Sequence, residues 1–159
     1  MITEKDIEFI NKAIDLSKNG MDKNAGGPFG ALVVKDGKII AEGYNKVTSS
    51  NDPTAHAEVV AIREACEKLN SFQLDGCTIY TSCEPCPMCL GAIYWARPAA
   101  VYYACTKEDA AEIGFDDQFI YEEIETDIGN RKIKFINLNR EEGNEVFKNW
   151  QTKEGRTDY

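Results

Sequence analysis

Two short segments of the chain carry residue types that bind transition metals. Residues 54–58 read T-A-H-A-E, and residues 85–89 read P-C-P-M-C. One histidine and two cysteines supply three protein ligands, which leaves the fourth position of a tetrahedral zinc ion for water. That ligand count is typical of a catalytic zinc site, because structural sites fill all four positions with side chains. We therefore predict that His56, Cys86 and Cys89 bind one Zn²⁺ per chain.

The spacing of these residues predicts where the metal lies relative to the helices. On a helix, residues two apart point about 200° away from each other, so His56 and Glu58 can both approach one metal only if it lies off the first turn. Cys86 and Cys89 are three apart and share a helix face, which allows the roughly 3.8 Å between two sulfurs on one zinc ion. Two helix N-termini then converge on the metal, and their partial positive charge favours thiolate over thiol.

The charge of this ligand set predicts a separate base. Zinc with two thiolates and a neutral imidazole is formally neutral, so it should acidify water less than a three-histidine site does. Glu58 can take the proton, deliver it to a ring nitrogen and later protonate a departing amine. Hydroxide attack on an amidine-like carbon with loss of ammonia is hydrolytic deamination. The pattern H-x-E…P-C-x-x-C is itself a known signature of the zinc-dependent base deaminases.

Composition limits the class of protein and of partner. The 159 residues suit one soluble domain without a membrane span, and the start shows no signal peptide, so we expect a cytoplasmic protein. In that compartment thiols stay reduced, and six cysteines indicate metal binding or core packing rather than disulfides. The net charge of −9 argues against a nucleic-acid partner and favours a small free substrate.

Hydrophobic periodicity and turn residues predict alternating helices and strands. A helix begins at Thr3 with Asp6 in a capping box, and Asp36-Gly37 forms a hairpin turn. Further strands are expected at 29–34, 38–44, 77–81, 99–104 and, at an edge, 133–138; further helices at 56–69, 86–96, 107–112 and 141–150. This order predicts a three-layer α/β/α sandwich with a central mixed sheet of about five strands.

Longer segments carry a resemblance to a known family. They are G-P-F-G-A at 27–31, S-N-D-P-T-A-H-A-E at 50–58, Y-T-S-C-E-P-C-P-M-C at 80–89, I-Y-W-A-R at 93–97, G-F-D-D at 114–117 and the terminal Tyr159. Over essentially its whole length the sequence resembles the small bacterial guanine deaminases of the cytidine deaminase superfamily. The zinc motifs belong to the whole superfamily, which includes tRNA adenosine deaminases, whereas G-F-D-D and the tail point towards guanine.

The resemblance implies further roles. Asn45 would hydrogen-bond the purine and Asp117 would read its N–H donors, with the adjacent Asp116 as the alternative acceptor. Members of the family form homodimers in which the C-terminal segment crosses to the neighbour. Residues 1–159 would then form one domain whose helix and tail, 140–159, close an active site, either that of the same subunit or that of the neighbouring one, with Tyr159 as part of the lid.

The predicted function is zinc-dependent hydrolysis of guanine to xanthine and ammonia, in purine catabolism or salvage. The enzymatic alternatives are a tRNA-specific adenosine deaminase or another nucleoside or base deaminase. The alternative outside enzymes is a structural zinc module that binds a partner, which would close all four metal positions. Cys83 is expected to pack near the metal rather than bind it, and a thioredoxin-like redox role for Cys86 and Cys89 is disfavoured by the His-x-Glu segment.

Overall fold

The structure is a computed structural model that describes residues 2–159. The chain divides into two compact units, Met1–Asp117 and Gln118–Tyr159. The first unit contains α1 (Glu4–Asp22), β1 (Gly30–Lys35), β2 (Lys38–Tyr44), α2 (Val47–Ser50), α3 (Ala57–Leu69), β3 (Cys77–Cys83), α4 (Pro87–Ala96), β4 (Ala100–Cys105) and α5 (Lys107–Glu112). The second contains α6 (Gln118–Glu125), the 3₁₀ turn η1 (Ile128–Asn130) and α7 (Arg140–Thr152).

The sheet of the first unit is mixed, with strand order β2-β1-β3-β4. Strand β1 pairs antiparallel with both β2 and β3, whereas β3 and β4 are parallel. The parallel pair is joined through α4, as a strand-helix-strand connection requires. Strand β2 ends immediately before Asn45, and β3 ends shortly before Cys86. Both strands therefore lead into segments that carry predicted site residues.

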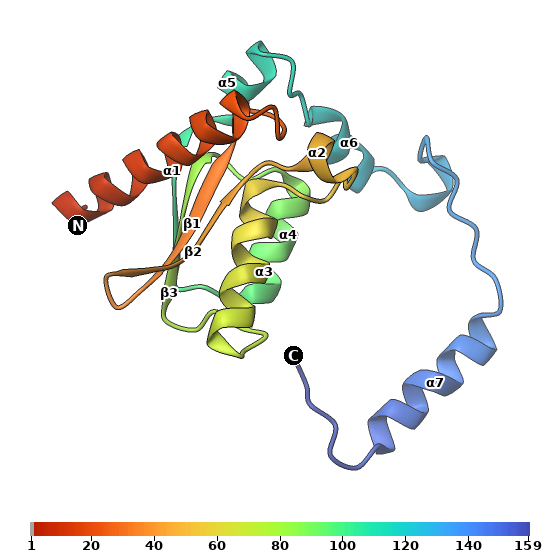
Figure 1. Ribbon diagram of the computed structural model, residues 1–159. Coiled ribbons are helices and arrows are strands. Elements are labelled where there is room, and N and C mark those ends of the chain that lie inside the picture. The colour runs from red at the N-terminus through yellow and green to blue at the C-terminus, as the bar shows by residue number, and fades with distance from the viewer. Residues whose placement is uncertain (1) are drawn as a thin grey trace. The chain divides into compact units, whose positions relative to one another are not determined.

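Helices cover both faces of this sheet, with α1 on one face and α3 beside α4 on the other (Figure 1). Side chains alternate between the two faces along β1. Ala31 and Val33 join the core under α3 and α4, and Leu32 and Val34 join the core under α1. This is the α/β arrangement that the sequence predicts.

Local signals explain where the elements begin and turn. The Thr3 hydroxyl accepts a hydrogen bond from the Asp6 amide, and the Asp6 carboxylate accepts one from the Thr3 amide, so the predicted capping box is confirmed. Asp36 and Gly37 join β1 to β2 with φ of +50° and +70°. Positive φ at both central residues is what a tight hairpin turn needs, and the predicted turn is confirmed.

The helix that carries the first metal motif lies very close to the sheet. A Cβ atom on Gly43 of β2 would be 2.5 Å from the Ala57 carbonyl oxygen and 2.9 Å from the Ala61 amide nitrogen, both in α3. Only glycine at this strand position permits such an approach. The close contact fixes the start of α3 against the end of β2, and so fixes the residues on either side of that junction.

The predicted edge strand at 133–138 is wrong, and within the described residues the sheet has four strands rather than about five. Apolar residues alternate with polar ones only up to Phe135, after which Ile136 follows directly, so no single face is maintained. Helix α6 was not predicted, although Ile120 and Ile124 have the four-residue spacing of a helix.

No helix within residues 2–159 is both long enough and apolar enough to cross a membrane.

Candidate metal centre

Two helix starts bring the predicted metal ligands together. His56 is the N-cap of α3 and Cys86 is the N-cap of α4, and neither side chain is used in a capping hydrogen bond. Pro87 occupies the first position of α4, where its missing N–H costs nothing. Cys89 lies within the first turn of α4 and is fully buried. Both sulfurs therefore lie near positive helix ends, which favour thiolates.

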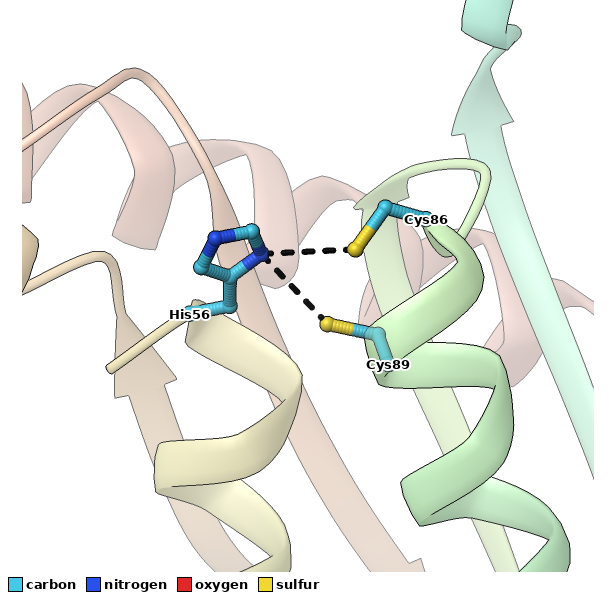
Figure 2. A group of neighbouring side chains, drawn as sticks. All are labelled: His56, Cys86 and Cys89. Atoms are coloured by element: carbon cyan, nitrogen blue, oxygen red, sulfur yellow. Dashed lines mark hydrogen bonds between the residues drawn. The ribbon is translucent and has the colours of Figure 1, made fainter. Parts of the chain in front are cut away.

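The three donor atoms have the spacing of a tetrahedral zinc site. They lie within 4.8 Å of one another. The Nδ1 atom of His56 is 3.5 Å from Sγ of Cys86 and 3.6 Å from Sγ of Cys89, and Figure 2 shows the three side chains pointing towards one another. Zn–N and Zn–S bonds at a tetrahedral angle place nitrogen and sulfur about 3.6 Å apart. The residues present therefore fit a zinc ion held by three protein atoms.

The two thiols differ strongly in acidity. Hydrogen bonding with Cys89, and then with His56, lowers the pKa of the Cys86 thiol to about 4. The same hydrogen bond between the sulfurs, together with burial, raises the pKa of Cys89. The first of the two thiol protons is therefore easier to remove than the second. Zinc binds the deprotonated form of both cysteines, so a bound cation would take the place of the second proton.

A carboxylate lies beside these ligands. Glu58, the second residue of α3, is only 6 % exposed, and burial raises its pKa. Its Oε1 atom accepts a hydrogen bond of 3.1 Å from the Thr81 hydroxyl, and its Oε2 atom is 3.4 Å from Sγ of Cys89. The structure thus places one oxygen of a buried carboxylate within reach of the metal site, as a proton carrier requires.

The predicted purine-binding residues of the first unit have distinct environments. Asn45 directly follows β2 and is buried, and its Oδ1 atom accepts a hydrogen bond of 3.1 Å from the Val47 amide. Asp117 is half-buried, and its pKa is raised first by burial and then by the negative charge of Cys86. Asp116 is exposed. Asp117 is thus the less exposed of the two carboxylates, and its role in substrate binding stays a prediction.

Other predicted residues lie outside this group. Tyr159 belongs to the second unit and is 69 % exposed, so its role as a lid stays a prediction. Cys83 is buried at the end of β3, where its thiol contacts the Thr106 carbonyl oxygen at 3.4 Å. Burial raises the pKa of this thiol to about 12, which keeps it protonated and suits packing rather than ligation.

Sequence reasoning missed Thr81, the hydrogen-bond partner of Glu58. It belongs to β3 and is 1 % exposed, on the strand face that otherwise packs Cys77 and Ile79 into the core. A hydroxyl at the third position of an apolar alternation was the available signal, because a buried hydroxyl needs a polar partner. The sequence did not show that this partner is the carboxylate at the start of α3.

Comparison with known proteins agrees with this site. Residues 3–105 match the family model described as the cytidine and deoxycytidylate deaminase zinc-binding region. A guanine deaminase of Bacillus subtilis (strain 168) is 56 % identical over 151 residues, which cover 95 % of this chain and 97 % of that protein. An X-ray structure of the guanine deaminase from Bacillus subtilis superposes with a TM-score of 0.94 and 54 % identity, over 99 % of both chains.

A second group of relatives matches a smaller part of the chain. The tRNA-specific adenosine deaminase of Aquifex aeolicus (strain VF5) is 42 % identical over 96 residues, which are 60 % of this chain and 63 % of that protein. The similarity to the first group therefore extends beyond the zinc motifs. The chain belongs to the cytidine and deoxycytidylate deaminase family.

Proposed function

We propose that this protein is a zinc-dependent guanine deaminase, which hydrolyses guanine to xanthine and ammonia. The observation that carries the proposal is the buried carboxylate of Glu58 beside a metal site with three protein ligands. The choice of guanine is supported by similarity to a guanine deaminase over nearly the full length of both chains.

His56, Cys86 and Cys89 would hold the zinc ion. When bound, zinc acts as a Lewis acid that makes water nucleophilic near neutral pH. The protein supplies the remaining chemistry. Its two helix N-termini stabilise the thiolates, and its buried surroundings exclude bulk water from the carboxylate.

Glu58 would move the protons of the reaction. It would take one proton from the attacking water and pass it to a ring nitrogen of the purine. It would then take the second proton from the same oxygen and give it to the departing amine. The C2–N bond breaks, a C2–O bond forms, and ammonia leaves. Burial suits this cycle, because it raises the pKa of the carboxyl towards the range in which it can both accept and return a proton.

Asn45 and Asp117 would orient the base. Since Oδ1 of Asn45 is already used by the Val47 amide, its Nδ2 group is the part available to donate a hydrogen bond to a purine acceptor. Asp117 can accept hydrogen bonds from the N1–H and the exocyclic amine of guanine. A carboxylate and an amide donor together would distinguish guanine from adenine, which lacks the N1–H donor.

We also propose that the chain acts as a homodimer in which residues 140–159 close the neighbour's site, with residues 1–159 folding as one functional domain. The family resemblance supports this arrangement. In addition, α7 exposes Val146, Phe147 and Trp150, which is a surface that another element is expected to cover.

A complementation experiment tests the dimer. A Glu58→Gln chain is mixed with a chain truncated after residue 139, and both are inactive alone. If tails cross, the mixed dimer has one site with Glu58 from the truncated chain and a lid from the full-length chain, and activity returns. If each tail closes its own site, the mixture stays inactive.

The function itself is tested by measuring ammonia release from guanine, guanosine, adenine and cytosine with zinc-loaded protein. Guanine should be the best substrate, and activity confined to another base would replace guanine in the proposal. A structural zinc module predicts no ammonia from any of them. A tRNA deaminase predicts instead tRNA binding that weakens steeply as salt rises.

A further inference from the structure

A fully buried threonine contacts the carboxylate that the proposed reaction uses. Thr81 in β3 is 1 % exposed, and its hydroxyl donates a hydrogen bond of 3.1 Å to Oε1 of Glu58. The hydroxyl comes from the sheet, whereas the carboxylate comes from the start of α3. This bond therefore ties the two elements together at the metal centre.

The position of Thr81 makes its orientation well defined. Its strand lies inside the sheet, paired with β1 on one side and β4 on the other. Its side chain is β-branched, which restricts rotation about χ1. The face it shares with Cys77 and Ile79 is otherwise packed with apolar side chains. The hydroxyl is thus held rigidly in a region where an unpaired polar group would be costly.

The two oxygens of Glu58 have different neighbours. Oε1 accepts from Thr81, and Oε2 is 3.4 Å from Sγ of Cys89. A cysteine bound to zinc is a thiolate and has no proton to donate. Of the two side chains that contact the Glu58 carboxylate, only Thr81 can then donate a hydrogen bond when metal is bound, and it donates to Oε1.

We propose that Thr81 is a positioning residue that fixes Oε1 of Glu58, so that Oε2 is the oxygen that carries protons. The inference rests on the proposed function, because it assumes that Glu58 is the proton carrier. Proton transfer depends on short and aligned donor-acceptor geometry, so a carboxylate free to rotate reaches that geometry less often.

The test compares Thr81→Val with Thr81→Ser. Valine has nearly the shape of threonine but no hydroxyl, and serine keeps the hydroxyl. Thr78→Val is the matched control, because Thr78 lies on the same strand with its side chain on the opposite face. For each zinc-loaded protein, kcat and KM for guanine, zinc content and melting temperature are measured.

In Thr81→Val we expect kcat to fall about 10- to 100-fold, the range expected when a catalytic group is misplaced by about 1 Å. KM should change by less than about threefold, and zinc content should stay at the wild-type level, since no metal ligand is altered. Thr81→Ser should recover most of kcat, and Thr78→Val should have the wild-type kcat.

Other results would overturn the inference. A Thr81→Val protein with wild-type kcat at a temperature well below its melting point would show that the hydroxyl only satisfies a buried group. Equal losses in the valine and serine variants would point to packing. If the wild type releases no ammonia from any base, the proposed function is wrong and the role of Thr81 is wrong with it. If the wild type is active, the comparison of variants tests the role of Thr81 alone.

Discussion

Replacing Glu58 by glutamine separates the chemical role of this residue from its structural role. Glutamine has the same size, so it leaves no cavity at a site that is only 6 % exposed. Its amide oxygen can still accept the hydrogen bond from Thr81, which in the native protein is 3.1 Å long. The substitution removes a negative charge and the ability to carry a proton, and little else.

The expected effect on the reaction is large. A positioned general acid or base contributes about 10²- to 10⁴-fold to a rate, and Glu58 would serve in more than one transfer. We therefore expect kcat to fall by about 10³-fold or more, which corresponds to about 4 kcal/mol of transition-state stabilisation. Stability should not decrease, because an uncharged amide is easier to bury than a carboxylate.

Steady-state ammonia release, zinc content and thermal melting measure these effects. Glu64→Gln is the matched control, since Glu64 lies on the same helix with its side chain 40 % exposed and paired with Lys68. Glu64→Gln should be fully active. If zinc-loaded Glu58→Gln keeps more than about a tenth of the wild-type kcat, Glu58 is not the proton carrier.

Three further sets of substitutions test recognition, packing and acid stability. Asp117→Asn should lower kcat/KM for guanine about 10- to 100-fold, as expected for one charged hydrogen bond, with a smaller effect from Asp116→Asn; an unchanged substrate profile would move recognition elsewhere. Gly30→Ala should destabilise the protein by about 1–3 kcal/mol in urea unfolding, because its Cβ would lie 2.3 Å from a backbone oxygen of α1. In Gly91→Ala the added Cβ in α4 meets open space, so the substitution should stabilise the protein by about 0.5–1 kcal/mol. Similar effects at the two glycines would contradict the close contact between Gly30 and α1. Hydrogen bonds from a tyrosine and a threonine hydroxyl lower the pKa of Asp6, so its contribution to stability is present above the ordinary carboxyl pKa and is lost as pH falls through the lowered one. Asp6→Asn should accordingly reduce the fall in melting temperature between pH 7 and pH 3, and an identical fall in both proteins would disprove that linkage.

The metal site could be predicted from sequence because its information is local. His56 and Glu58 lie in one helix start, and Cys86 and Cys89 lie in another, so their spacing alone limits the geometry. The motif also contains all three predicted ligands, one histidine and two cysteines. Only the meeting of the two helix starts required the fold, and the alternation of strands and helices was strong enough to predict it.

The parts that sequence did not predict depend on distant contacts. Thr81 is an ordinary strand residue until α3 places a carboxylate against it. The segment 133–138 has apolar residues but no consistent face, and a strand forms only where a partner completes its hydrogen bonds. Helix α6 was not predicted, although Asp117, a residue type favoured at helix starts, directly precedes it and its isoleucines have a four-residue spacing.

X-ray absorption at the zinc edge, together with elemental analysis, tests the central claim most directly. The protein purified from zinc-supplemented cells should contain one zinc per chain, with two sulfur neighbours at about 2.3 Å and two nitrogen or oxygen neighbours at about 2.0–2.1 Å. One of the light neighbours should be replaced when a purine analogue binds, while the sulfurs stay. Protein without zinc, or zinc with four side-chain ligands that no small molecule displaces, would contradict an open catalytic site at His56, Cys86 and Cys89.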